Sequence, residues 1–127
     1  MSKLAALALL APLTAYAAPP HGITPDPAMA EYYHSLKVPG TTALCCTIAD
    51  CRNVRARVRL DADGSYEAYI DSATFPDDDS PYHGHAPNAW VKVPEAVIIH
   101  DKPNLSGEPI ACWYNGELRC FVPASGV

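Results

Sequence analysis

The sequence predicts a small, mostly β domain with one short N-terminal helix, built as a small antiparallel sheet or barrel-like fold and stapled by disulfides. Apolar and polar residues alternate with period two over Val54–Leu60 and Tyr66–Asp71, as in half-buried strands. Asn115-Gly116 lies between two apolar runs, a strong signal for a β-hairpin. Five cysteines in so short a chain favour a disulfide framework if the chain is exported.

Residues 1–17, "MSKLAALALLAPLTAYA", have the pattern of a secretory signal peptide. Lys3 precedes an apolar run, and Ala15-Tyr16-Ala17 has the small residues of a cleavage site. The run is about half of the roughly 20 residues that a spanning helix needs, so a membrane anchor is the weaker alternative. We expect cleavage after Ala17, no membrane span in the mature chain, and a location in the periplasm or outside the cell.

Cleavage leaves 110 residues, which is enough for one domain. Loss of Lys3 leaves eight Lys and Arg against 14 Asp and Glu, a formal charge of −6. Such an acidic chain disfavours binding to phosphate backbones. Alternation on a strand explains three of the four residues in its one basic cluster, which comprises Arg52, Arg55, Arg57 and Arg59. We therefore expect no nucleic-acid partner.

Residues 18–27 are rich in proline and small side chains, which predicts a flexible arm before a single domain at residues 28–127. Asp26 and Pro27 fit an N-cap and a first helical position. Four residues then recur at helical spacing, which predicts a two-turn helix that ends before Pro39 and packs on a sheet: Met29, Tyr32, Tyr33 and Leu36.

The two alternating segments predict a hairpin whose outer face pairs Arg with Glu or Asp, a solvated face in which each exposed pair contributes at most about 1 kcal/mol. "AWVKVP" predicts a strand that Pro94 ends, and "AVIIH" at residues 96–100 predicts another. The Asn115-Gly116 hairpin follows. Residues 72–88 break every periodicity and predict a long loop.

The five cysteines are Cys45, Cys46, Cys51, Cys112 and Cys120. A two-residue turn at Asn115-Gly116 would set Cys112 opposite Arg119, with its sulfur on the other face from that of Cys120. A turn with a glycine bulge would make the two cysteines diagonal neighbours, with Cβ atoms about 6–8 Å apart. Both registers argue against a Cys112–Cys120 bond.

We therefore expect two long-range disulfides that join Cys112 and Cys120 to two of the first three cysteines. Six pairings satisfy this condition, and the fifth cysteine stays undecided. Each bridge would stabilise the fold by roughly 4 kcal/mol in the chain-entropy model. The alternatives are a zinc site and a thioredoxin-like redox centre, both disfavoured by the spacing, and an odd cysteine that is buried and inert or links two copies in a dimer.

The loop at residues 72–88 carries the other constellation with possible chemistry. Its two imidazoles and three carboxylates predict, as an alternative to a plain solvated loop, a site for a divalent transition metal: His83, His85, Asp77, Asp78 and Asp79. Otherwise we expect no cofactor. Ser106 is not in a nucleophile elbow, and no phosphate loop follows a strand, so we expect no enzyme.

These observations predict an exported binding or envelope-associated module whose partner is an unknown protein or envelope component. Trp90, Trp113 and Tyr114 are the candidate contact surface, although both tryptophans are equally good core residues. A periplasmic metal-binding protein that uses the His83/His85 acidic loop is the alternative.

The chain also resembles a group of small, secreted, uncharacterised alphaproteobacterial proteins. The resemblance covers most of the mature chain and is carried by the patterns S-L-x-x-P-G-T, C-C-x-x-x-D-C-R, W-x-x-V/I-P, N-x-x-G-x-x-x-x-C-W and C-F-V-P. This chain differs in having Leu105 where proline is common and a longer acidic loop with His83 and His85. The resemblance brings no established activity with it, and the His-rich loop is particular to this member.

Overall fold

The computed structural model describes residues 27–46, 50–60, 64–76 and 84–125. Their order is α1 (Pro27–Ser35), β1 (Asp50–Asn53), β2 (Ala56–Val58), β3 (Tyr66–Ile70), β4 (Ala89–Lys92), a 3₁₀ turn η2 (Glu95–Val97), β5 (Ile110–Tyr114) and β6 (Glu117–Val122). The predicted class is confirmed: the fold is mostly β with one short helix.

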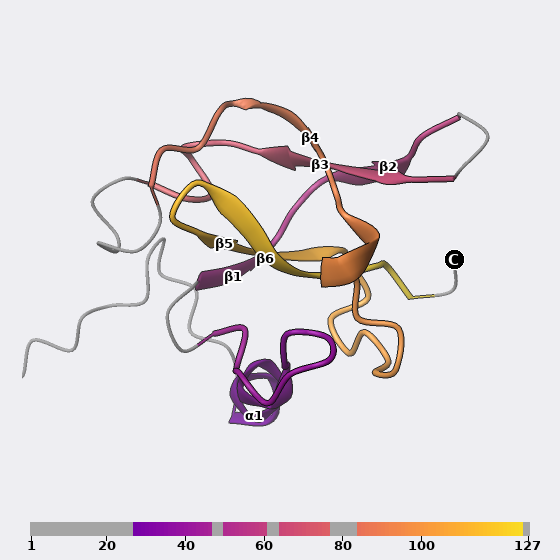
Figure 1. Ribbon diagram of the computed structural model, residues 1–127. Coiled ribbons are helices and arrows are strands. Elements are labelled where there is room, and N and C mark those ends of the chain that lie inside the picture. The colour runs from indigo at the N-terminus through magenta and orange to yellow at the C-terminus, as the bar shows by residue number, and fades with distance from the viewer. Residues whose placement is uncertain (1–26, 47–49, 61–63, 77–83, 126–127) are drawn as a thin grey trace, which may run out of the picture.

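The strands form two antiparallel sheets of three strands each, in the orders β1-β5-β6 and β2-β3-β4. Figure 1 shows three layers, with the β2-β3-β4 sheet on one side of the β1-β5-β6 sheet and α1 on the other. The middle sheet is therefore covered on both faces. This explains why β5 is a continuous apolar run instead of an alternating one, with four of its five residues buried.

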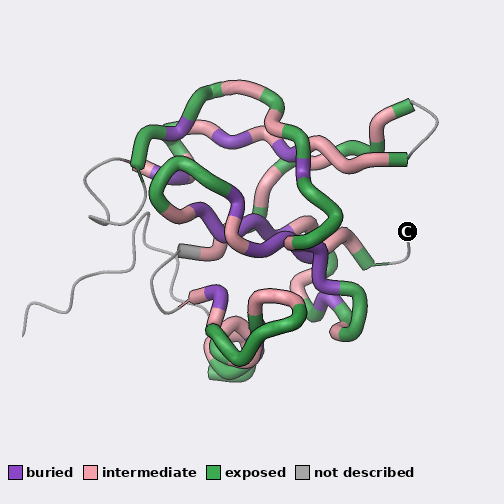
Figure 2. Tube along the Cα trace, in the orientation of Figure 1, coloured by how far each residue is buried: buried purple, intermediate pink, exposed green. Residues whose placement is uncertain are grey.

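Two hydrophobic clusters fill the spaces between the layers. The cluster between the sheets contains Ala68, Ile70, Phe75, Ala86, Val93, Ile98, Ala111, Trp113, Leu118 and Phe121. The cluster between the middle sheet and the helix contains Tyr32, Leu36, Cys45, Ile99, Ile110, Cys112, Cys120 and Val122. Because successive side chains of a strand point to opposite faces, β5 supplies alternate residues to each cluster. Figure 2 shows the buried segments concentrated in this middle layer.

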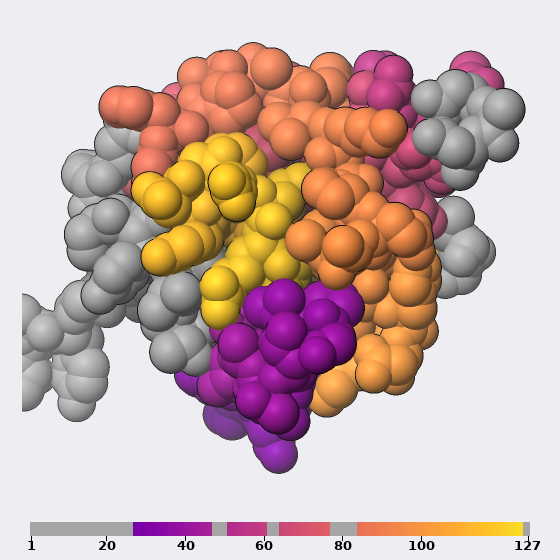
Figure 3. Space-filling model, viewed as in Figure 1, coloured from indigo at the N-terminus to yellow at the C-terminus, as the bar shows by residue number. Residues whose placement is uncertain are grey.

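The N-terminal helix begins at Pro27, as predicted, and buries Tyr32 against the middle sheet. A turn with Gly40 at φ +74° then reverses the chain, so that the Cys45 amide donates a hydrogen bond to the Leu36 carbonyl at 2.9 Å. This reversal brings Cys45 back beside the helix. Figure 3 shows this N-terminal segment packed directly against the C-terminal strand.

The segment predicted as one strand, Val54–Leu60, is shorter and follows a change of sheet. β1 pairs with β5, whereas β2 pairs with β3, so the chain crosses between the sheets at residues 54–55. The predicted hairpin of β2 and β3 is present. Its far end extends beyond the core, and Leu60 is fully exposed although its place in the alternation predicts burial. Figure 1 shows the end of the β2-β3 hairpin projecting past the β1-β5-β6 sheet.

Residues 96–100 do not form the predicted strand. A 3₁₀ turn occupies Glu95–Val97, with the Ile98 amide bonded to the Glu95 carbonyl at 3.1 Å. Only a single parallel bridge joins Ile98 to Phe121. The turn places Ile98 in the cluster between the sheets and Ile99 in the cluster beside the helix. This short apolar run therefore contributes to both clusters instead of extending a sheet.

The C-terminal hairpin has the predicted two-residue turn, with φ at +47° for Asn115 and +80° for Gly116, as a type I′ turn requires. Trp113 lies opposite Leu118, but a register shift between Cys112 and Trp113 then places Cys112 opposite Cys120. Both predicted registers for the cysteines were therefore wrong. The irregularity adds one residue to β6 after the turn, and neither predicted register included it.

Among the described residues, no helix has both the length and the apolar character needed to cross a membrane.

Candidate functional site

The two disulfides join the segment after the helix to the C-terminal hairpin, as predicted. Cys45 is bonded to Cys120 and Cys51 to Cys112, across sequence separations of 75 and 61 residues. Cys46 is the fifth cysteine and lies outside both bonds. All four bonded cysteines lie on the helix side of the middle sheet, where the alternation of β5 and β6 directs Cys112 and Cys120.

Cys46 lies against one of these bonds. The sulfur atoms of Cys46, Cys51 and Cys112 are all within 4.8 Å of one another. In the described part of the chain, no other trio of His, Cys, Asp or Glu side chains brings its ligand atoms so close. Two of these sulfurs are in a disulfide and cannot act as thiolate ligands, so the predicted zinc alternative does not fit the oxidised protein.

Tyr33 lies close enough to both Cys46 and Arg52 for their charges to change its pKa. Burial raises the pKa of Tyr33, the negative charge of a Cys46 thiolate raises it further, and the Arg52 guanidinium lowers it. The Arg52 Nη1 also lies 3.3 Å from the Cys51 carbonyl oxygen and donates to it. These contacts place the Arg52 cation beside Tyr33 and the Cys51 backbone.

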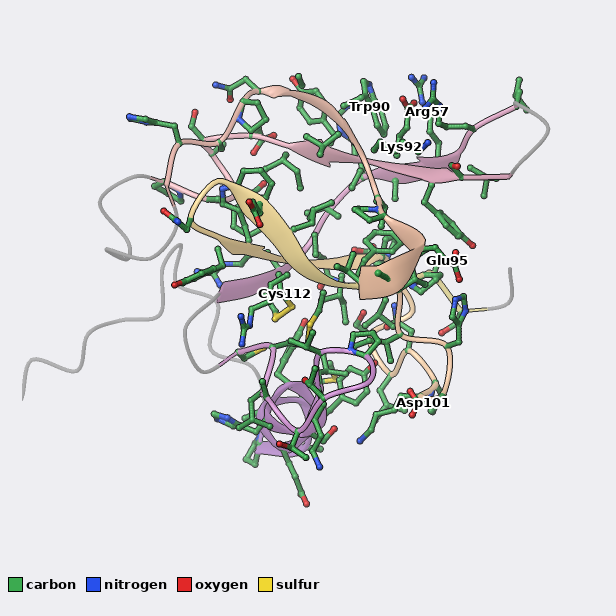
Figure 4. The ribbon with its side chains drawn as sticks, in the orientation of Figure 1. Arg57, Trp90, Lys92, Glu95, Asp101 and Cys112 are labelled. Carbon is green, nitrogen blue, oxygen red and sulfur yellow. A yellow bond between two sulfur atoms is a disulfide. The ribbon has the colours of Figure 1, made fainter. Side chains whose placement is uncertain are left out.

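A second group of side chains lies on the outer face of the β2-β3-β4 sheet. Tyr69 lies opposite Trp90, and their rings meet edge to face with centroids 5.5 Å apart. The guanidinium carbon of Arg55 is 4.3 Å from the centre of the Tyr69 ring, and that of Arg57 is 4.3 Å from the Trp90 ring. Figure 4 shows Arg57, Trp90 and Lys92 pointing together away from the core.

The same face carries the ion pairs that the alternation predicts. Arg57 donates to the Glu67 carboxylate through Nε and Nη2, both at 3.0 Å, and the Arg59 Nε lies 3.5 Å from the other carboxylate oxygen. The sequence reasoning missed the aromatic part of this arrangement. The signal was available, because Tyr69 occupies an outward position between Glu67 and Asp71 in the alternation of β3.

A shallow groove of about 660 Å³ begins beside these rings, where the chain crosses between the sheets. Aromatic, amide, guanidinium and carboxylate groups line it, among them Asn53, Arg55, Tyr69, Asp71, Trp90 and Glu108. Among the described residues, no carboxylate lies within ion-pair distance of Arg55, whose guanidinium rests on Tyr69 at the edge of the groove. The groove therefore offers ring surface, hydrogen-bonding groups and an accessible cation together.

The three aromatic residues predicted as a contact surface lie in different surroundings. Trp113 is 3% exposed and packs in the core near Phe75, so the core alternative describes it. Tyr114 is half-buried beside Arg119. Trp90 is 36% exposed, and of the three it is the one that lies beside other potential binding groups, namely Tyr69 and Arg57.

The predicted metal loop is described only in part. Asp77, Asp78, Asp79 and His83 lie outside the described residues, and His85 is exposed. Gly84 has φ +64°, and a Cβ built there would be 2.6 Å from the Gly116 amide nitrogen. The glycine of His-Gly-His is thus required by close packing against the hairpin turn, whatever the histidines bind. The metal site itself stays a prediction.

Ser106 belongs to a structural network centred on Asn104, the one buried polar residue in the described part of the chain. The Asn104 Nδ2 donates to the carbonyls of Glu108 at 2.6 Å and Pro123 at 2.9 Å. Its Oδ1 accepts from the Ser106 and Gly107 amides. This network explains the N-x-x-G motif, since Gly107 has φ +79°, and it gives Ser106 a structural contact at 2.7 Å to Asn104.

No family model, curated protein or solved structure matches this chain. The resemblance to the alphaproteobacterial group therefore stays a prediction from the sequence motifs.

Proposed function

We propose that this protein is an exported, non-enzymatic binding domain that holds an acidic glycan of the cell envelope on the outer face of its β2-β3-β4 sheet. The contact surface comprises the Tyr69 and Trp90 rings, the guanidiniums on them and the adjoining groove. The single observation that carries the proposal is the row formed by Arg55, Tyr69 and Trp90 beside a polar groove.

The exposed Trp90 supports a contact role. It lies on a regular strand, and its indole combines a large apolar surface with one hydrogen-bond donor, which suits a partly wet interface. A sugar ring offers the complementary combination of apolar C–H faces and a rim of hydroxyls. The amide and carboxylate groups of Asn53, Asp71 and Glu108 in the groove are suitable partners for such hydroxyls.

The local charge supports an acidic ligand. Cationic side chains gather on this face although the whole chain is acidic: Arg57 and Arg59 contact the Glu67 carboxylate, Lys92 is paired with Glu67 across the strands, and Arg55 lies over Tyr69. Guanidinium groups donate in a planar fork that fits carboxylate and sulfate oxygens. Arg57 is already held by Glu67 and Trp90, so its remaining N–H groups are oriented in advance.

Export is supported by the signal-like N-terminus and by the two disulfides. Disulfides persist in oxidising compartments such as the periplasm and the cell exterior, and cytosolic reductants remove them. An envelope glycan would be accessible to the protein in either of these locations.

Binding of the mature chain to immobilised polygalacturonate, with neutral dextran as the second surface, tests the proposal. We expect binding to the acidic polymer only, and weakening between about 0.05 M and 0.5 M salt as screening increases. Trp90→Ala and Arg55→Ala should each weaken binding at least about tenfold. The matched control is Leu105→Ala, because Leu105 is 61% exposed and lies outside the groove lining.

Equal binding to dextran, or equal affinity of the Trp90→Ala and Leu105→Ala variants, would refute the proposed surface. Circular dichroism of each variant checks that the fold is retained.

A further inference from the structure

The three sulfurs of Cys46, Cys51 and Cys112 form an arrangement that neither a structural disulfide nor a binding face requires. A thiol lies within 4.8 Å of both sulfurs of a disulfide. Thiol–disulfide exchange needs only a thiolate that can reach a sulfur of the bond, and no external oxidant or reductant. The reactants for one exchange step are therefore all present in this chain.

We propose that Cys46 exchanges with the Cys51–Cys112 disulfide, so that the protein exists as two covalent isomers. The Cys46 thiolate attacks the Cys112 sulfur, a Cys46–Cys112 bond forms, the Cys51–Cys112 bond breaks, and Cys51 leaves as a thiolate. The bonding pair of the broken disulfide stays on Cys51, so the number of disulfides does not change. The Cys45–Cys120 disulfide takes no part.

Burial determines which sulfur leaves. Cys112 is fully buried in the layer under the helix, whereas Cys46 and Cys51 are half-buried. A Cys112 thiolate would carry its charge into an apolar site, which is unfavourable, but a Cys51 thiolate would be partly solvated. Arg52 follows Cys51 directly and donates to its backbone carbonyl, so the protein already holds a cation on this residue's main chain.

The second isomer changes how β1 is held. In the Cys51–Cys112 isomer this strand is joined to β5 both by a covalent bond and by backbone pairing. After exchange only the backbone pairing holds β1, and the new bond fixes the segment at Cys46 to β5 instead. This inference does not depend on the proposed glycan surface, which lies on the other sheet.

The Cys51→Ser variant tests the reach of Cys46 directly. We expect this variant, purified from an oxidising compartment, to contain no alkylatable thiol after denaturation and to yield a peptide pair linked through Cys46 and Cys112. The control is the double variant Cys46→Ser/Cys51→Ser, which should contain one thiol, that of Cys112. Two alkylatable thiols in Cys51→Ser would overturn the proposal.

A second measurement uses the unaltered protein and so does not depend on folding of that variant. The native chain is alkylated at about pH 8, quenched with acid to stop exchange, and digested without reductant. We expect label on Cys46 and, in a minor fraction of about 1–10%, on Cys51. The Cys46→Ser variant gives the background. Label on Cys51 that does not exceed this background would overturn the proposal.

Discussion

Cys112 and Cys120 lie directly opposite each other on β5 and β6, yet each is bonded to a cysteine outside the hairpin. Both side chains point toward the helix layer, where Cys45 arrives from the turn after α1 and Cys51 arrives on β1. The hairpin is thus tied to two separate segments. A bond within the hairpin would have fixed only a pairing that the backbone already makes.

Removal of the Cys45–Cys120 bond should strongly destabilise the domain. The bond joins residues 75 positions apart, so its loss in Cys45→Ala/Cys120→Ala should lower the free energy of unfolding by about 4 kcal/mol. Urea denaturation of the mature chain measures this change. Cys46→Ala is the matched control, since it changes a neighbouring cysteine and leaves both bonds intact. Equal stability of the two variants would contradict the expected contribution.

Gly84→Ala should be more destabilising than Gly64→Ala. The two glycines have nearly the same φ, +64° and +62°, so the conformational cost of a side chain, about 1 kcal/mol, is similar for both. Only at Gly84 would the new Cβ meet backbone, at 2.6 Å from the Gly116 nitrogen. This overpacking should lower the free energy of unfolding of Gly84→Ala by roughly 1–3 kcal/mol more. Thermal or urea unfolding of both variants compares them, and equal losses would contradict this close contact.

Asn104→Asp should destabilise the loop that precedes β5 although it preserves shape. The amide Nδ2 donates to the carbonyls of Glu108 and Pro123, and a carboxylate cannot donate to either. The two carbonyls would then face a buried charge without a donor, which should lower the free energy of unfolding by at least about 1–3 kcal/mol. Urea unfolding measures this change. The exposed Asn53→Asp exchange is the control, because Asn53 also donates to the Glu108 carbonyl but lies in contact with solvent. A smaller loss for Asn104→Asp than for this control would be inconsistent with the network.

Stability should fall in alkaline solution, in part through Tyr33. Burial, followed by the charge of Cys46, raises its pKa in the folded protein above the unfolded value of about 10. The unfolded chain then loses this proton first as pH rises. The stabilisation is therefore full below about pH 10 and is lost as pH rises through the folded pKa.

Tyr33→Phe should reduce this alkaline loss, and Cys46→Ser should reduce it less, because Cys46 is the second cause of the shift. Urea unfolding at about pH 9 and about pH 11, with tyrosinate absorbance as a second reading, measures both effects. Tyr32, whose pKa is also raised by burial, accounts for part of the remaining dependence. Identical pH dependence in the parent chain and Tyr33→Phe would exclude this role for Tyr33.

Sequence signals within a single segment were sufficient to predict the elements that depend on that segment alone. Pro27 begins the helix, Asn115-Gly116 forms the predicted turn, and the hairpin of β2 and β3 follows its alternation. The absence of a Cys112–Cys120 bond was also predicted correctly, but from a wrong register. The shift after Cys112 depends on how β6 packs between two layers, and no local pattern reports that.

The parts that sequence reasoning missed depend on contacts between distant segments. The chain changes sheets at residues 54–55, yet the alternation of apolar residues continues through the crossing, so the pattern predicts one strand. The proximity of Cys46 to the Cys51–Cys112 bond likewise requires β1 and β5 to be neighbours. The row of Arg55, Tyr69 and Trp90 also depends on pairing between distant segments: the Tyr69 amide donates to the Arg55 carbonyl in the crossing segment, and β3 pairs Tyr69 with Trp90 of β4.

The Cys45–Cys120 bond also determines how the molecule would respond to a pulling force. Tension applied to the two ends of the chain would pass from residue 45 to residue 120 through the sulfur–sulfur bond. Residues 46–119 form a closed loop that this tension bypasses. The whole β2-β3-β4 sheet lies within that loop. A ligand on that sheet would therefore be held by a structure that mechanical load on the chain ends does not unfold.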